Sequence, residues 1–193
     1  MISLKYLNEA LLYNAEAASL TWRHDRPLSH FKTGRAWNIY KKRDAGNPAG
    51  SIWSSGYRGV CVGRTNLLAH RVIYAMHNSI EPCDLPDIID HKDGDILNNR
   101  IDNLRPATTG QNMHNRRLNE NNTSGHKGVS FKKKTKRWVA NIRVDGVKIH
   151  LGYFDTAEEA GEARKKAASE LHGDFARHAT TPTNDNAKKE AAA

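Results

Sequence analysis

The sequence predicts an α+β protein in which short strands and helices follow one another along the chain. Three local patterns indicate this class. The β-branched pair Ile88-Ile89 is typical of a short strand. Residues 137–143 alternate between apolar and polar side chains, as in a strand with one buried face. Alanines and a leucine recur at helical spacing between Ala160 and Leu171.

The N-terminal part begins with a short amphipathic helix that carries Leu4, Leu7, Leu11 and Leu12, and a short strand follows at residues 20–22. Residues 23–43 are strongly basic, with interleaved aromatic residues and a single acid. This stretch is either an arm that tracks DNA phosphates or a solvated loop, and the sequence does not decide between them.

A hairpin is predicted next, because glycines punctuate residues 46–62, and a helix follows around residues 71–77. Ile88-Ile89 then leads into Asp90-His91, and Leu104 lies in a second short extended segment. Thr108 and Gln111 form the pattern of a capping box, which predicts a helix start. Asn112 falls in the first turns of this helix.

Four residues of this region supply the groups that phosphodiester hydrolysis requires: Asp90, His91, Asn103 and Asn112. Attack by water needs a base to take its proton and a cation to absorb charge on the phosphate. Neutral histidine accepts protons near neutral pH, and carboxylate and amide oxygens suit Mg²⁺ or Mn²⁺. Residues 81–95 are rich in acids although the chain has a net charge of +9. An acidic surface loop is the alternative, because Asp93-Gly94 is typical of turns.

These residues also resemble the motif of HNH endonucleases, specifically the phage-type, intron-homing branch with asparagine in the third position. The resemblance rests on three segments in order, with Ala69-His70-Arg71 as lead-in, and covers about residues 45–120. The three segments are Asp90-His91-Lys92-Asp93-Gly94, residues 98–105 and Gln111-Asn112.

This resemblance implies a ββα-metal core that holds one divalent cation, Mg²⁺ or Mn²⁺. His91 would be the general base, and Asp90 and Asn112 the metal ligands. Asn103 would fix the loop and orient His91. His70 is expected to pack beneath the site, Asn98 and Asn99 to form turns, and His114 to point away from Asn112. Arg100 and Arg105 would contact phosphate or pair with the acidic loop.

Cysteine usage argues against zinc. Cys61 and Cys83 are isolated, so no pair has the spacing of a structural zinc site, and no structural zinc is expected. Unpaired cysteines also favour a reducing, intracellular compartment. The resemblance to phage-type nucleases implies the cytoplasm of a bacterial or phage-infected cell. No signal peptide and no membrane-spanning run is visible.

The C-terminal part concentrates positive charge on predicted strands. Residues 126–150 contain eight basic residues and one acid, Asp145, which forms a hairpin turn signal with Gly146. A third strand is predicted from Val147 to Phe154. Thr156 caps the following helix, which ends at Gly173. A three-stranded antiparallel sheet covered by one helix would leave a basic face free for the DNA major groove, or simply solvated, since lysine-rich edges also prevent aggregation.

This region resembles the plant apetala-two/ethylene-response-factor domain in four segments: Lys127-Gly128-Val129, residues 138–143, residues 151–154 and residues 156–160. By this resemblance Trp138 belongs to the helix-packing face. The plant domain has an arginine at Ser130 and an aromatic residue at His150, so sequence preference does not transfer. The DNA-facing positions would be Lys127, Ser130, Lys132, Arg137, Asn141, Arg143, Lys148 and His150.

These interpretations give a domain order. Residues 1–45 form an N-terminal helix and DNA-contacting region, 46–118 the nuclease, 119–124 a linker, 125–175 the DNA reader and 176–193 a disordered tail. We expect a metal-dependent endonuclease acting on double-stranded DNA as a monomer or weak dimer, with no small-molecule cofactor and no membrane partner. It could nick one strand or cut both. The alternatives are a DNA-binding regulator with an inactive nuclease core, or a structural nucleic-acid-binding protein.

Overall fold

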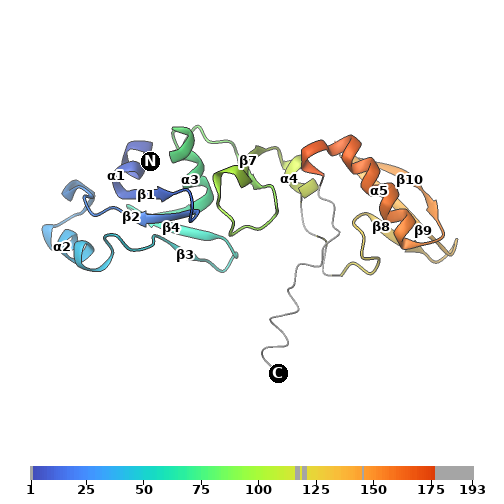
Figure 1. Cartoon of the computed structure of the whole chain (residues 1–193), viewed down its shortest axis with the longest axis horizontal. Coiled ribbons are helices and arrows are strands. Elements are labelled where there is room, and N and C mark those ends of the chain that lie inside the picture. The colour runs from blue at the N-terminus through green and yellow to red at the C-terminus, as the bar shows by residue number, and fades with distance from the viewer. Residues whose placement is uncertain (1, 116–117, 119–120, 145, 177–193) are drawn as a thin grey trace, which may run out of the picture. The chain divides into compact units, whose positions relative to one another are not determined.

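The computed structural model describes residues 2–115, 118, 121–144 and 146–176. It divides into two compact units, Met1–Thr108 (unit 1) and Thr109–Ala193 (unit 2). Both contain helices and strands, which confirms the α+β class (Figure 1). Residues 119 and 120 of the predicted linker, the predicted turn residue Asp145 and the predicted tail from residue 177 onward lie outside the described residues.

Unit 1 begins with helix α1 (Leu4–Ala10), whose first turn is capped by the Ser3 hydroxyl accepting from the backbone N–H of Tyr6. Strands β1 (Leu11–Asn14) and β2 (Ser19–Trp22) then pair as an antiparallel hairpin. The predicted helix was two residues too long, because Leu11 and Leu12 already belong to the hairpin. The leucine pattern fits both states, since Leu7 and Leu11 are each 1% exposed within one core.

The basic stretch after β2 is folded, in contrast to the predicted arm or loop. It forms the short 3-10 helix η1 (Leu28–His30) and helix α2 (Gly34–Arg43). Arg26 is 7% exposed, and its guanidinium lies over aromatic rings at 4.7–5.9 Å from their centroids. Arg26 therefore stabilises this corner through cation–π contacts and is not placed to track phosphate. The rings are those of Tyr6, Trp22, Phe31 and Tyr40.

A three-stranded antiparallel sheet follows, with β4 in the centre and the predicted helix packed against it. The strands are β3 (Ser51–Ile52), β4 (Arg58–Val62) and β5 (Thr65–Leu68). Helix α3 (Ala69–Asn78) directly follows β5 and contacts α1, β4 and β5. Its buried side chains join those of β4 in the core of unit 1, which also contains Leu7 and Leu20.

The last elements of unit 1 form a two-stranded antiparallel ladder, β6 (Ile88–His91) with β7 (Leu104–Ala107). A loop and the 3-10 helix η2 (Ile101–Asn103) connect them. Ile89 and Leu104 are each 5% exposed and belong to the same core as α1 and α3. This core therefore anchors the ladder that carries Asp90 and His91.

Unit 2 begins with helix α4 (Thr109–Asn115) and contains an antiparallel sheet in the order β10-β9-β8. Its strands are β8 (Val129–Lys132), β9 (Arg137–Val144) and β10 (Val147–Phe154). Helix α5 (Ala157–His172) contacts all three strands, and the 3-10 helix η3 (Gly173–Phe175) contacts α4 (Figure 1). Trp138 packs with the core between sheet and helix, as predicted.

Helix α5 starts and ends where the sequence predicts. Thr156 and Glu159 form a reciprocal capping box, and Gly173 is the C-cap. Its predicted apolar stripe is wrong at one end, because Leu171 is 46% exposed while Arg164 is buried. The sheet covers the face that includes Ala160 and Arg164. Tertiary packing decides which face of this helix is buried, and the residue composition of the helix does not. Within the described ranges, no helix combines the length and apolar character needed to cross a membrane.

Substituting Leu7 tests the core that supports the β6–β7 ladder. Leu7→Ala is expected to lower the free energy of unfolding by about 2–5 kcal/mol, because it removes buried methyl groups and leaves a cavity. Urea unfolding followed by tryptophan fluorescence measures this change. Leu12→Ala, at a residue that is 45% exposed, is the matched control and should change stability by about 0.5 kcal/mol at most. Equal effects would contradict the assignment of this core.

Candidate active site

Two polar residues are buried at the end of strand β6. Asp90 is 6% exposed and His91 is 4% exposed, although both would be well solvated in an unfolded chain. The preceding Ile88 and Ile89 favour extended backbone, and Ile89 fixes the strand in the core. Buried polar groups require partners, so the contacts of these two side chains define what the site can do.

Asp90 forms a buried ion pair across the ladder. It lies directly opposite Arg105, whose Nε and Nη2 both donate to Asp90 Oδ2, at 3.1 and 3.0 Å. The Arg105 side chain is only 11% exposed. Of the two predicted roles for Arg105, the structure therefore places its guanidinium on an acid of the site, and Asp90 already meets a positive charge there.

His91 bonds to an asparagine that was not singled out as a site residue. Its Nε2 lies 3.0 Å from Oδ1 of Asn99, which is 1% exposed. The sequence interpretation assigned Asn99 to a turn and gave the orientation of His91 to Asn103. Asn99 lies eight residues after His91 in an irregular loop, and local turn chemistry gives no signal for such a contact.

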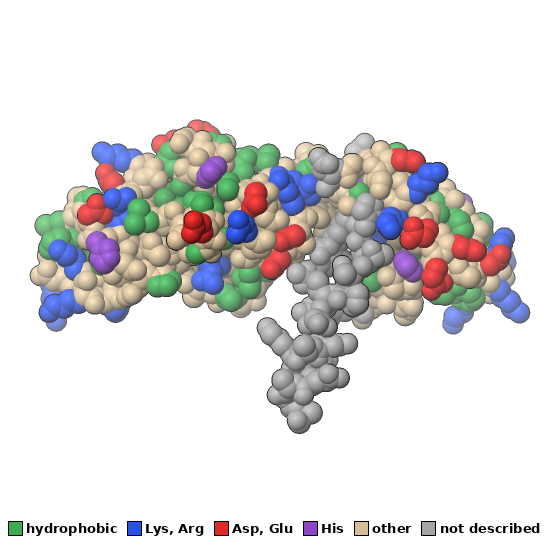
Figure 2. Space-filling view, in the orientation of Figure 1, with side chains coloured by type: hydrophobic (Ala, Val, Ile, Leu, Met, Phe, Trp, Pro, Cys, Tyr) green, Lys and Arg blue, Asp and Glu red, His purple; other side chains and the backbone are tan. Residues whose placement is uncertain are grey.

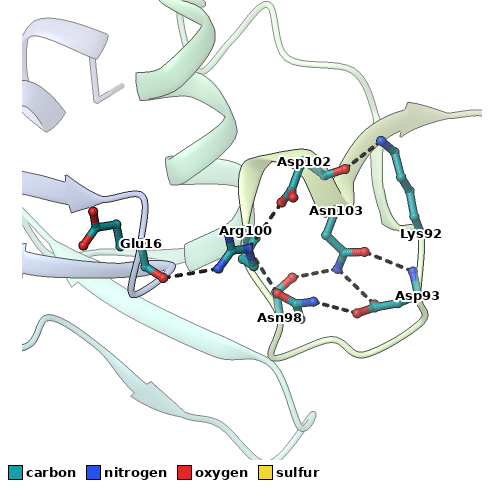
Figure 3. A network of polar contacts seen from close by, with 7 residues as sticks. All are labelled: Glu16, Lys92, Asp93, Asn98, Arg100, Asp102 and Asn103. Carbon is teal, nitrogen blue, oxygen red and sulfur yellow. Dashed lines mark hydrogen bonds and ion pairs between the residues drawn. The ribbon is translucent and has the colours of Figure 1, made fainter.

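Asn103 instead holds the loop that follows His91 (Figure 3). Its Nδ2 donates to Asp93 Oδ1 at 2.9 Å and to the backbone oxygen of Asn98 at 2.8 Å, and its Oδ1 accepts from the backbone N–H of Asp93 at 3.0 Å. Three bonds from one amide join both sides of the loop. These contacts lie within the loop, and the catalytic role predicted for Asn103 stays a prediction.

Asp93 is held as a carboxylate by the same network. Burial alone would raise its pKa, but hydrogen bonds from Asn98, from the Asp95 backbone and from Asn103 outweigh burial and lower it. The ionised form is therefore stabilised in the folded loop. Lys92 adds a further hydrogen bond across this loop, because its Nζ donates to the backbone oxygen of Asp102 (Figure 3).

The wall of the site is formed by two rings. His70 of α3 packs edge-on against His91 with ring centroids 4.9 Å apart, and Tyr57 lies 5.5 Å from His70 and 6.3 Å from His91. Burial lowers the pKa of His70 to about 3, helped by the nearby His91 and Arg71. A neutral His70 therefore packs beneath His91 at physiological pH.

The metal-binding chemistry of the site rests on few donors. Asp90 supplies a carboxylate, which is paired with Arg105 in this structure. Among the residues that the structure describes, no group of three or more His, Cys, Asp or Glu side chains is arranged to hold a metal ion. Both cysteines, Cys61 and Cys83, are exposed and free.

Asn112 lies on α4 in unit 2 and is half-buried. Asp90 and His91 belong to unit 1, so the structure describes the two halves of the predicted metal site in separate units. The side chain of His114 lies outside the described residues. Arg100, also predicted to contact DNA, is an exposed residue at the start of η2 that contacts the Glu16 backbone and the Asp102 carboxylate (Figure 3).

The predicted DNA-facing residues of unit 2 share one face of its sheet. Val129 and Ala140 pack toward α5, so the residues that alternate with them point to the opposite side. Lys132 lies opposite Arg137, and Lys148 lies opposite Arg143. The residues on this face are Ser130, Lys132, Arg137, Asn141, Arg143, Lys148 and His150. Lys127, half-buried, precedes β8.

Charge is divided between the sheet and the helix of unit 2. Strands β8, β9 and β10 contain no acidic residue, whereas α5 begins with Glu158 and Glu159. Acidic side chains are visible over α5 (Figure 2). Arg137 is partly neutralised by Asp155, which lies 2.8 Å from its Nη2. The sheet face is therefore the basic surface of this unit.

The low pKa of His70 predicts a specific pH dependence of stability. Between pH 6.5 and about 3 the unfolded chain binds a proton at His70 that the folded protein excludes. This contribution to stability is complete above pH 6.5 and declines by about 1.4 kcal/mol per pH unit as the pH falls. His70→Phe keeps a ring and should flatten this decline in urea unfolding measured from pH 7 to 4. His77→Phe, at an exposed position of the same helix, is the matched control and should keep the wild-type slope of stability against pH. An unchanged slope in His70→Phe would contradict the lowered pKa assigned to His70.

The region that contains the candidate site is similar to known proteins. Residues 67–114 match the family model of HNH endonucleases, a range that includes Asp90, His91, Asn103 and Asn112. The chain is 35% identical over 108 residues to "Uncharacterized HNH endonuclease L560" of Acanthamoeba polyphaga mimivirus, covering 55% of this chain and 54% of that protein. It is 38% identical over 58 residues to "APETALA2-like protein 2" of Oryza sativa subsp. indica, covering 30% of this chain and 13% of that protein. No solved structure matches.

A further relative shares most of its length with this chain. "Protein 3.8" of Escherichia phage T7 is 37% identical over 89 residues, which cover 46% of this chain and 73% of that protein. The family model and the mimivirus relative therefore agree. The chain contains an HNH endonuclease domain, which makes it a DNA nuclease.

Proposed function

We propose that this protein is a metal-dependent endonuclease that hydrolyses phosphodiester bonds of duplex DNA, with His91 as the general base. The observation that carries this proposal is the buried Asp90–His91 pair at the end of β6, in which each side chain has a defined hydrogen-bond partner. A general base is effective when its position is fixed before substrate arrives. The contacts of Asn99 and His70 with His91 supply that fixation.

Asp90 and Asn112 would hold one divalent cation, Mg²⁺ or Mn²⁺. Their carboxylate and amide oxygens are the donors such hard cations prefer. When bound, the cation stabilises negative charge on the scissile phosphate and on the leaving oxygen. His91 takes the proton of the attacking water, and family resemblance implies 5′-phosphate and 3′-hydroxyl ends.

Two arginines of unit 1 would act near the phosphate. Arg100 is exposed and long enough to meet a DNA backbone, so it fits a phosphate contact. Arg105 would orient the Asp90 carboxylate, with which it pairs, and is proposed as a second contact to phosphate. Asn103 supports catalysis by keeping the loop after His91 in one conformation.

Unit 2 would bind DNA through the basic face of its sheet. Lys148 and Arg143 lie directly opposite each other on adjacent strands, as do Lys132 and Arg137. Like charges in such pairs repel and destabilise a sheet. A polyanion bound on this face would relieve the repulsion, which favours a nucleic-acid surface over a merely solvated one.

The domain reading completes the proposal. Residues 46–118 would form the nuclease with its ββα-metal core, and residues 125–175 the apetala-two-like DNA reader. Residues 1–45 share the core of unit 1 with the nuclease, so their contribution to DNA binding would come from exposed basic residues of α2 rather than from a loose arm. In its most specific form, the proposal is that the protein is a homing-type phage enzyme that nicks DNA.

Plasmid cleavage tests the catalytic assignment. Wild type is expected to convert supercoiled plasmid to open circles in Mg²⁺ or Mn²⁺ and to do nothing in EDTA. His91→Ala should cleave at least about 100-fold more slowly, because the general base is lost. His77→Ala, at an exposed histidine of α3, controls for the substitution. If no variant cleaves in any metal while all still bind DNA, the regulator with an inactive nuclease core replaces this proposal.

Removing one charge tests the sheet surface. Arg143→Ala should weaken DNA binding and reduce the slope of log K against log salt by about 1 if Arg143 neutralises a phosphate. If Arg143 reads a base instead, the loss is about 1–3 kcal/mol and depends on sequence. Fluorescence anisotropy at several salt concentrations distinguishes these results. Lys165→Ala on α5 is the control, and equal losses for both variants would reject the sheet face as the binding surface.

A further inference from the structure

Asn99 occupies an unusual position for an asparagine in a loop. It lies between β6 and β7, is 1% exposed, and is among the largest side chains that unit 1 buries completely. Its Oδ1 lies 3.0 Å from Nε2 of His91, and this bond is itself buried. Its neighbour Asn98 has a different partner, because Asn98 Nδ2 donates to Asp93 Oδ2 at 2.7 Å.

The chemistry of this contact determines which ring nitrogen of His91 carries hydrogen. An amide oxygen can only accept a hydrogen bond, so Nε2 must be the protonated nitrogen of the neutral ring. The lone pair then lies on Nδ1. Ring packing against His70 and Tyr57 fixes the plane of the imidazole but cannot choose between its two tautomers.

The cost of this arrangement argues that it serves a purpose. Asn99 Nδ2 is buried and has no hydrogen-bond partner in the described part of the chain. An unpaired buried N–H destabilises a fold, and such groups in native proteins need an explanation. An apolar residue would avoid the penalty but would leave Nε2 of His91 without this acceptor.

We propose that Asn99 is the positioning residue that holds His91 in the Nε2–H tautomer and thereby makes Nδ1 the proton-accepting nitrogen. This inference rests on the proposed role of His91 as general base. As one O–H bond of water breaks, its proton bonds to Nδ1 and the resulting hydroxide attacks phosphorus, while the hydrogen on Nε2 stays there and is donated to Asn99 Oδ1. Asn99 itself exchanges no proton and acts only through His91.

Nitrogen-15 NMR of the full-length protein without DNA or metal tests the tautomer directly. The His91 ring is assigned by the signals that disappear in His91→Ala, at a pH where the ring is neutral. Wild type should show the Nε2–H tautomer, with Nε2 and Nδ1 shifts far apart. Asn99→Ala should bring the two shifts closer together and speed exchange of the Nε2 hydrogen. Asn99→Asp, which keeps an acceptor oxygen, should restore the wild-type pattern.

Asn98→Ala is the matched control, since it removes the same amide from the adjacent position and breaks a loop bond without touching the ring. It should leave the His91 tautomer unchanged. An Nδ1–H tautomer in wild type would overturn the inference, whether or not the alanine variant folds. Equal effects of Asn98→Ala and Asn99→Ala would also overturn it, because general loosening of the loop would then explain both.

Cleavage kinetics separate this inference from the proposed function. Asn99→Ala should lower kcat about 10–100-fold with KM changed less than about twofold, and Asn99→Asp should recover most of the rate. If wild type shows the expected tautomer but does not cleave DNA, the nuclease proposal fails and the geometry of Asn99 stands. If wild type cleaves and Asn99→Ala cleaves equally well, the role of Asn99 fails alone.

Discussion

Burial of a carboxylate and an imidazole side by side, at the end of one short strand, is the constraint on which the site in unit 1 depends. Each unpaired group would cost about 1–3 kcal/mol or more. The antiparallel register places Arg105 opposite Asp90, and the loop returns Asn99 to His91. Because the loop contains no regular strand, side-chain hydrogen bonds must hold it in place. Asn103 provides them through Asp93 and Asn98 (Figure 3).

Three asparagines of this loop therefore have different tasks, although they look alike in the sequence. Asn98 and Asn103 bond to the loop itself, whereas Asn99 bonds to the ring of His91. This division links stability to function. The loop network keeps Asn99 in place, Asn99 fixes the ring, and α3 supports the ring from the other side through a neutral His70. Unit 2 adds a basic sheet face whose like-charged pairs suit a polyanion.

Local signals predicted much of this molecule. The capping box at Thr156, the strand leading into Asp90 and the helix after residue 68 follow from residue types within a few positions of each other. The sequence could not predict features that depend on distant packing. Arg26 was counted in a basic stretch that was either a phosphate-tracking arm or a solvated loop. Its burial could not be predicted, because its aromatic partners lie up to 20 residues away in the sequence. The bond from Asn99 to His91 depends in the same way on the path of an irregular loop.

The central claim is that His91 performs the chemistry as general base while the sheet of unit 2 supplies binding. Single-turnover cleavage at saturating DNA tests it most directly, with wild type, His91→Ala and Arg143→Ala compared at matched occupancy. The account predicts that Arg143→Ala reaches the wild-type rate once DNA is saturating, whereas His91→Ala stays slow at every DNA concentration. A slow rate in Arg143→Ala at saturation, or recovery of His91→Ala by added DNA, would contradict the assignment of chemistry to His91 and of binding to the sheet of unit 2.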